Sequence, residues 1–320
     1  MFVKTFLKMF PPPKFLAMPY AGLDISDDNI RCVTYGSKFG HKYIKSFSSL
    51  DLPNGLLDGG DTKDQSKLIK LISDFAKKAA LSYVKVSIPE EKAYLFETDV
   101  PMMDIHSIRQ NIESKLEENV PLAAPDALFY FDLLPPAVDG GSLRASVSVV
   151  PRTYIEHIIS ILSAAGIKPV AFEVVPKALA RVVIPNDSTE TVVIVHIMEH
   201  KTGIYIVSNG VVCFTSTLSR ESNNTPSKLS DEDTIAQEVI HINEYWVSRV
   251  GVSAISRVIL VGRDALKYEK ALGGTITELS VPVSVPEVWS NICDKKSCVP
   301  SIKRADSFAY AVAAGLAIQL

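Results

Sequence analysis

The sequence predicts an α/β or α+β fold in which two similar hairpins occur far apart in the chain. Strand-like and helix-like patterns alternate along its 320 residues, as is typical of these classes. An apolar run enters a tight polar turn at 22–26 and leaves as a second strand at 30–34, and the same arrangement returns at 192–198 and 204–207. Each turn can offer backbone N–H groups, and an Asp at its start can hold Mg²⁺ through water. Two such hairpins indicate a two-domain clamp for phosphate groups.

The composition is that of an ordinary folded protein and narrows the possible partners. Apolar residues make up 47% and charged residues 22% of a chain long enough for one large domain or two to three smaller ones. The net charge of −3 gives no case for binding nucleic acid. The four cysteines are too few and too scattered for a disulfide scaffold, which favours a reduced, cytosolic setting. No apolar run approaches the ~20 residues of a membrane span.

Residues 1–20 are expected to form a tail outside the folded domains. They carry Lys4, Lys8 and Lys14 and no acidic residue, beside several Phe, Leu and Met side chains. The short apolar stretch is interrupted by Lys8, and prolines at 11–13 end any helix, so a signal peptide is not predicted. The tail is disordered or loosely docked in one interpretation and makes a weak contact with anionic lipid or a membrane partner in the other.

Periodicity predicts the elements of the first half. Apolar residues at helical spacing predict a helix over 62–80, and a buried strand over 84–88 is closed by Pro89. A different unit begins near residue 92 with a strand at 93–98, and Asp104 is expected to cap the helix that follows.

This unit continues as two strands and a helix. The strands are predicted over 127–134 and 143–149, and a helix from about residue 153 ends at Gly166, a suitable C-cap. Together these elements make an insert of about 75 residues, 92–166, which can fold semi-independently.

The second half again alternates strands and helices. The acidic segment 230–233 gives a capping-box-like start to an amphipathic helix. Buried strands are predicted over 257–262 and 281–285. Asp306 is expected to cap a small-residue helix over 308–318.

A zinc-peptidase motif occurs at 196–200, but its context does not support it. The segment His196-Ile-Met-Glu-His200 matches H-x-x-E-H, whose two histidines must lie one turn apart on a helix. The flanking residues read as strands, in which these side chains do not converge. Cys293 and Cys298 have no second pair for a structural zinc site, and no Walker loop or G-x-S-x-G motif occurs. Only the two hairpins therefore suggest a chemical mechanism.

The order of these elements resembles the type IV pilus assembly protein PilM family, an actin-like family close to the cell-division protein FtsA. The resemblance covers nearly the whole chain. It is carried by Gly22-Leu-Asp-Ile-Ser26, Phe96-Glu-Thr-Asp-Val-Pro101, Glu118-Asn-Val-Pro-Leu122, Ala165-Gly-Ile-Lys-Pro169, Phe172-Glu173, Ile259-Leu-Val-Gly262 and Tyr310-Ala-Val-Ala-Ala-Gly-Leu-Ala317. The leader Pro11-Pro-Pro-Lys-Phe-Leu16 also resembles family members with a short N-terminal extension.

The resemblance implies an actin-like (ribonuclease H-like) fold of two lobes with an inserted α+β subdomain. The first lobe would comprise 21–91 and 167–190, the insert 92–166, and the second lobe 191–320, with 216–254 as its smaller subdomain. ATP with Mg²⁺ would lie between the lobes. The partner would be the short N-terminal cytoplasmic tail of a PilN-like inner-membrane pilus protein, bound in a groove near the insert.

By position, the resemblance also assigns residues to the nucleotide site. Gly22, Asp24 and Ser26 belong to the first phosphate loop, and Asp24 is the candidate Mg²⁺ carboxylate. Gly262 belongs to the adenosine-side turn, where the Gly-Gly often found in the family is Gly262-Arg263.

The second phosphate loop departs from the family pattern. That loop reads Asp-x-Gly with a Thr four residues further, and here these positions are His196, Met198 and Thr202. Neutral imidazole brings no negative charge to Mg²⁺, which prefers oxygen ligands. Met at a glycine position puts a side chain where phosphate must approach. In the first loop Asp27 and Asp28 would repel phosphate.

The sequence hypothesis is therefore a cytosolic actin-like scaffold of the pilus platform that binds a peptide of a membrane partner and has lost or weakened nucleotide hydrolysis. It would sit at the inner face of the membrane through that partner, and a homo-oligomer is possible. One alternative is a working ATPase in which Asp24 alone organises Mg²⁺. The other is an FtsA-like filament that tethers to membrane, which needs a C-terminal amphipathic helix that residues 317–320 do not supply.

Overall fold

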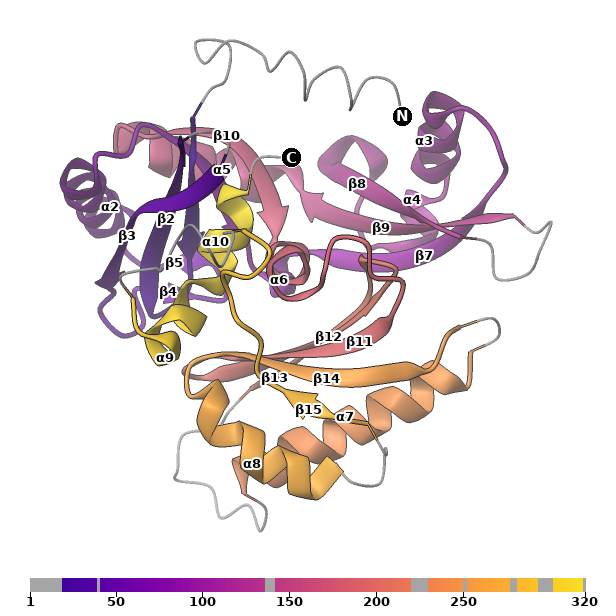
Figure 1. Ribbon diagram of the computed structural model, residues 1–320. Helices are drawn as coiled ribbons and strands as arrows, with labels where there is room; N and C mark the ends of the chain where they lie inside the picture. The colour runs from indigo at the N-terminus through magenta and orange to yellow at the C-terminus, as the bar shows by residue number, and fades with distance from the viewer. Residues whose placement is uncertain are drawn as a thin grey trace.

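The chain folds into two lobes with a smaller sheet beside the first. Figure 1 shows the computed structural model, which describes residues 19–38, 41–135, 142–219, 230–249, 252–276, 281–292 and 302–318. Two five-stranded sheets and one three-stranded sheet organise these residues. Of the predicted tail 1–20, all but Pro19 and Tyr20 falls outside the described residues.

The first sheet contains the first predicted hairpin. Its order is β10-β6-β1-β2-β3, and its strands are β1 (Ala21–Ile25), β2 (Asn29–Lys38), β3 (His41–Asp51), β6 (Tyr83–Ile88) and β10 (Lys168–Val174). The β1–β2 pair is antiparallel, whereas β6 and β10 continue the sheet in parallel. Helices α2 (Gln65–Ala79) and α5 (Arg152–Ala164) share a core with this sheet. A two-stranded hairpin, β4 (Leu57–Asp58) and β5 (Asp61–Thr62), precedes α2.

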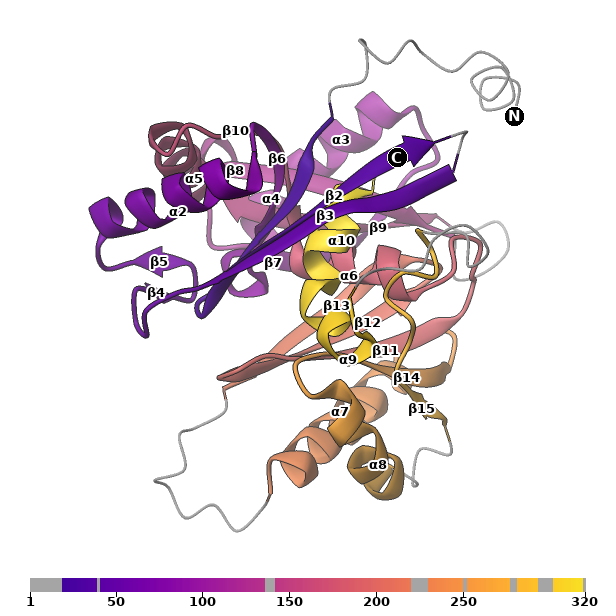
Figure 2. The same ribbon diagram turned by 60° about the vertical axis from the view of Figure 1, so that its left-hand side comes forward.

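The second sheet contains the second hairpin, and its three central strands are mostly buried. Its order is β13-β12-β11-β14-β15, and its strands are β11 (Thr191–Ile197), β12 (Lys201–Ser208), β13 (Val211–Ser219), β14 (Ile255–Gly262) and β15 (Val283–Ser284). Helices α7 (Asp231–Val247) and α8 (Ala265–Thr275) lie on its outer side in both views of the molecule (Figures 1 and 2). The apolar runs of β11 and β14 pair in parallel and are buried on both faces, as expected for central strands.

The inserted unit is a three-stranded sheet with its own small core. The order is β7-β9-β8, with β7 (Tyr94–Val100), β8 (Ala127–Leu134) and β9 (Leu143–Pro151), all antiparallel. Helices α3 (Ile105–Ser114) and α4 (Leu116–Asn119) pack on it. Short 3₁₀ turns at Glu90–Lys92 (η1) and Ala124–Asp126 (η2) enter and cross the unit.

Two of the expected helix N-termini are capped by the predicted side chains. Asp104 accepts hydrogen bonds from the backbone N–H groups of His106 and Ser107 at the start of α3. Ser230 accepts one from Asp233 at the start of α7. Each cap satisfies backbone donors that have no partner inside the helix.

Two helices join the lobes. Figures 1 and 2 show α6 (Val175–Val183) and α10 (Ala311–Ala317) between the two five-stranded sheets. Their backbones approach closely, because a Cβ built on Gly315 would lie 2.0 Å from the carbonyl oxygen of Ala178. α10 also lies against β1, where a Cβ on Gly22 would lie 1.9 Å from the carbonyl oxygen of Ala313.

The packing divides the chain differently from the expected boundaries. Helix α5, expected at the end of the insert 92–166, buries Ile158, Ile161 and Leu162 in the core of the first sheet. The three-stranded unit thus ends with β9. Likewise α7, expected in a separate subdomain 216–254, buries Val239 and Trp246 in the core shared with the second sheet.

The C-terminal end also differs in detail. Asp306 does not cap a continuous helix but lies within α9 (Arg304–Ser307), which follows Lys303 and leads through a 3₁₀ turn, Phe308–Tyr310 (η4), into α10. The strand expected over 281–285 shortens to β15. Within the described ranges, no helix is long and apolar enough to cross a bilayer.

Candidate functional site

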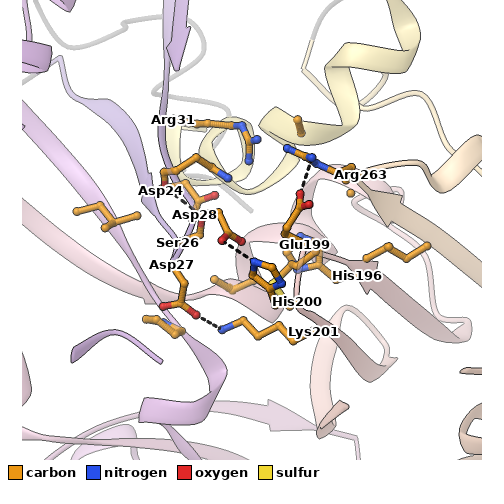
Figure 3. Close-up of a pocket in the computed structure, with 18 of the residues that line it drawn as sticks. Asp24, Ser26, Asp27, Asp28, Arg31, His196, Glu199, His200, Lys201 and Arg263 are labelled. Carbon is orange, nitrogen blue, oxygen red and sulfur yellow. Dashed lines mark hydrogen bonds and ion pairs between the residues drawn. The ribbon is translucent and has the colours of Figure 1, made fainter. Parts of the chain in front are cut away.

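The turns of the two predicted hairpins face each other across a cleft between the lobes. The β1–β2 turn and the β11–β12 turn line it, together with the start of α6, the turn after β14 and η4. Figure 3 shows the side chains of both turns pointing toward one another. The cavity is small, about 70 Å³. Pockets that hold nucleotide-sized ligands measure about 300–1,000 Å³.

Most of the expected site residues meet in this cleft. The lining includes Asp24 and Ser26 from the first lobe and His196, Met198, Gly262 and Arg263 from the second. Gly262 adopts a φ of 95°, which suits glycine in the turn after β14. The two turns singled out in the sequence therefore line one cleft.

Two expected site residues lie elsewhere. Gly22 precedes the turn and lies under α10, because successive strand residues point to opposite faces and its missing side chain makes room for that helix. Thr202 is fully buried in β12, and its hydroxyl has no hydrogen-bond partner among the described residues. Neither is among the residues that line the cleft.

Asp24 lines the cleft, in an environment that weakens it as a cation ligand. Asp24 is only 7% exposed to solvent. Burial raises the pKa of its carboxyl, although a hydrogen bond from Ser87 and the charges of Arg31 and Lys201 oppose this shift. No group of three or more potential metal ligands converges within the described part of the chain. Asp24 can at most hold a cation through water.

His196 is a neutral side chain at the position where the resemblance implies a carboxylate. Burial, followed by the nearby charges of Lys201 and Arg31, lowers the pKa of this imidazole to about 3. Its Nδ1 atom is buried and has no hydrogen-bond partner among the described residues. The site thus lacks an anionic oxygen ligand on the second lobe at this point.

Polar and charged side chains of the two turns contact each other across the cleft. Lys201 of the second hairpin lies 3.1 Å from the Asp27 carboxylate and also contacts Glu91, and His200 Nε2 lies 3.4 Å from Asp28 (Figure 3). Burial alone would lower the pKa of the Lys201 ammonium, but the hydrogen bond and charge of Glu91 and the charge of Asp27 raise it. The cleft that would receive phosphates is bridged by the protein's own charges.

A buried hydrogen bond also links the two lobes beside this cleft. The Tyr205 hydroxyl on β12 donates to Glu90, which follows β6, over 2.7 Å. Burial raises the pKa of the Glu90 carboxyl, and the neighbouring Glu91 adds to the shift. Sequence reasoning singled out none of Glu90, Glu91 and Lys201. The available signal was the opposite charge of single residues in the two turns, Asp27 in the first and Lys201 in the second.

A second, larger cavity lies between the first lobe and the inserted unit. This groove measures about 390 Å³ and is lined from β6, β8, β9, α5, β10 and the start of α6. Its walls are mostly apolar, and they comprise Ile88, Leu128, Phe129, Tyr130, Val150, Ile155, Ala171, Phe172 and Val174, with Lys85, Ser148, Glu173 and Lys177 as polar members.

The polar residues of this groove are paired. Lys85 lies 3.0 Å from Glu173, and Arg181 of α6 contacts both carboxylate oxygens of Glu173. At the rim, Lys177 lies 2.6 Å from Asp132 of β8. The groove is therefore apolar along most of its length, with an ionic cluster in its floor.

Comparison with known proteins identifies the fold. No family model and no curated protein sequence matches the chain. A solved structure described as the PilM–PilN type IV pilus biogenesis complex contains a chain that superposes with a TM-score of 0.76, over 94% of this chain and 98% of that chain, at 18% identity. The ethanolamine utilization protein EutJ of Carboxydothermus hydrogenoformans matches with a TM-score of 0.50, over 96% and 90%, at 12% identity. The protein has the two-lobed, actin-like α/β fold that the sequence predicts, and its resemblance to PilM holds at the level of the fold.

Proposed function

We propose that this protein is a cytoplasmic, actin-like scaffold of a type IV pilus inner-membrane platform. It binds the cytoplasmic segment of a PilN-like membrane partner in the groove between the first lobe and the inserted unit, and nucleotide hydrolysis is lost or weakened. The fold that it shares with a chain of a PilM–PilN complex supports the proposal. Its location at the inner face of the membrane follows from that partner.

The groove is the observation that carries this function. Its volume of about 390 Å³ falls in the range of ligand pockets, about 300–1,000 Å³. Among the described strands, β10 ends the first sheet and β8 ends the inserted sheet, and both line the groove. Strands at a sheet edge offer unpaired backbone N–H and C=O groups, to which an extended peptide can add as a further strand. Apolar walls then receive its alternate side chains.

Peptide binding tests this function directly. The probes are labelled peptides that cover the N-terminal cytoplasmic segments of membrane proteins encoded by neighbouring genes, and fluorescence anisotropy measures their affinity for the full chain. We expect one of them to bind and Ala171→Trp, which fills the groove, to weaken its binding at least tenfold. Ser163→Trp, on the exposed side of α5, is the matched control and should bind normally. Equal binding by the two variants would place the partner elsewhere.

The interlobe cleft supports the second part of the proposal. A nucleotide would have to separate Lys201 from Asp27 and Glu91 before its phosphates could enter a cavity of about 70 Å³. His196 would then present neutral imidazole where Mg²⁺ favours oxygen. Met198 places a side chain between the turns, and its φ is not in the left-handed region, so this turn does not require glycine.

Calorimetric titration with Mg-ATP distinguishes this proposal from a working ATPase. We expect no saturable binding at micromolar concentrations and no phosphate release above the buffer background, because the cleft is closed by ion pairs. Asp24→Asn preserves the shape of the one retained ligand and should leave this result unchanged. Micromolar binding with steady turnover in the wild type, lost in Asp24→Asn, would support the ATPase alternative.

A further inference from the structure

The ion-pair groups at the floor and the rim of the groove together carry one more positive than negative charge. Lys85, Arg181 and Lys177 contribute three cations, whereas Glu173 and Asp132 contribute two anions, and all five lie within the two ion-pair groups described above. The side chains of Lys85, Glu173 and Arg181 are each 9–10% exposed. One carboxylate thus serves two buried cations.

An unbalanced buried cation is costly unless an anion approaches it. Burial lowers the pKa of the Lys85 ammonium, with Glu173 opposing this shift and Arg181 adding to it. Arg181 already contacts both oxygens of Glu173 and donates to the Gly315 carbonyl over 2.8 Å. Lys85 lines the groove and retains donor capacity, because an ammonium group has three N–H donors.

The geometry of a bound strand brings side chains to this point. A peptide that pairs with the edge of β10 points alternate side chains to opposite sides. Lys85 lies on β6, one strand inward from the edge strand β10, and its ammonium reaches across to Glu173 of β10 and lines the groove into which a side chain of such a peptide would point. A continuous peptide strand would therefore present a side chain to Lys85, and not its terminal carboxylate.

From this charge surplus, and resting on the proposed function, we infer that the groove selects an extended apolar segment of another protein that carries one Asp or Glu side chain, which binds Lys85. Affinity comes from the apolar walls and the sheet edge, and the acidic side chain sets the register. This chemistry disfavours the chain's own residues 1–18, which are apolar but carry three lysines and no acid. The occupant is a partner, not this tail.

The test is a set of capped twelve-residue peptides, alternating Val and Thr, with one central position occupied by Glu, Gln or Lys and moved through the four middle positions. Binding to the full chain is measured by fluorescence anisotropy. We expect the tightest Glu peptide to bind at least tenfold more tightly than its Gln counterpart, and the Lys peptide most weakly. In Lys85→Met the Glu-to-Gln ratio should fall below twofold, whereas Lys85→Arg should retain it.

Controls separate this inference from the proposed function. Lys168→Met removes an exposed lysine of β10 outside the groove and should keep the full ratio; thermal unfolding of each variant checks that it folds. Equal binding of Glu and Gln peptides, a ratio that survives in Lys85→Met, or tighter binding by an uncapped neutral peptide or by residues 1–18 would each overturn the inference. A set in which no peptide binds would overturn it as well. The membrane-partner peptides above test the proposed function independently of all these outcomes.

Discussion

Replacing Gly315 by valine should prevent the lobes from packing together and lower the free energy of unfolding by ~3 kcal/mol or more. The position lies where α10 crosses α6, and a Cβ there would meet the Ala178 carbonyl oxygen at 2.0 Å. A backbone atom cannot move aside as a flexible side chain can, so the two helices must separate. Separation would also break the hydrogen bond from Arg181 to the Gly315 carbonyl. Denaturant unfolding followed by circular dichroism measures the loss.

Gly273→Ala is the matched control for this prediction. Gly273 lies within α8, and a Cβ there would have no atom within 4 Å. Alanine in a helix is favoured over glycine by ~0.5–1 kcal/mol, so this variant should be slightly more stable than the wild type. A similar loss of stability in both glycine variants would show that close packing between α6 and α10 is not the cause.

Removing the negative charge of Glu173 should be nearly as damaging. Glu173→Gln leaves Lys85 and Arg181 buried without their shared carboxylate, and breaking a buried ion pair costs ~3–5 kcal/mol. The effect should reach both lobes, because Glu173 lies on β10, the edge strand of the first sheet, while Arg181 lies on the connecting helix α6. Unfolding free energies at pH 7 measure the difference from the wild type.

The same carboxylate predicts how stability depends on pH. Burial would raise the pKa of Glu173, but the hydrogen bond and charge of Arg181, together with Lys85, lower it below the ordinary value of 4.5. A folded-state pKa below the unfolded one means that the stabilisation is fully present above pH ~4.5 and is lost as the pH falls through the folded value. The gap between wild type and Glu173→Gln should therefore shrink as the pH falls below ~4.5.

Glu118→Gln provides the comparison for this pH series. Glu118 is exposed on α4, so its substitution should change the unfolding free energy by less than ~0.5 kcal/mol at any pH in the range. A pH-dependent gap of equal size in both variants would contradict the assignment to the buried cluster.

The sequence predicted those elements whose pattern is local. The apolar runs predicted at 22–26, 30–34 and 192–198 coincide with strands β1, β2 and β11, because one or both of their faces are buried. The caps at Asp104 and Ser230 are formed for the same reason, since a cap depends on three or four neighbouring residues. Asp306 does not cap the last helix, because it lies inside the short helix α9 and the 3₁₀ turn η4 separates α9 from α10.

The candidate site was predicted in part. Six of the eight residues assigned to the nucleotide site line one cleft, because the turns of the two hairpins face each other across it. Gly22 was taken for a phosphate contact, although its small size makes room for a helix almost 300 residues further along the chain. No pattern in the sequence around Gly22 predicts its contact with α10.

The sequence by itself predicted many of the strands and helices and the positions of the two turns, and it shows His196 where the resemblance implies an acidic residue. It did not predict β3, β13, α6 or α8. The predicted features depend on side-chain periodicity and residue chemistry, which are local. Only the tertiary structure decided that Lys201 pairs with Asp27, 174 residues away, and that Lys85, Glu173 and Arg181 form one buried cluster below a groove. Such contacts depend on which surfaces the lobes bury against each other, and the energy of a charge depends on the partners and the water left around it.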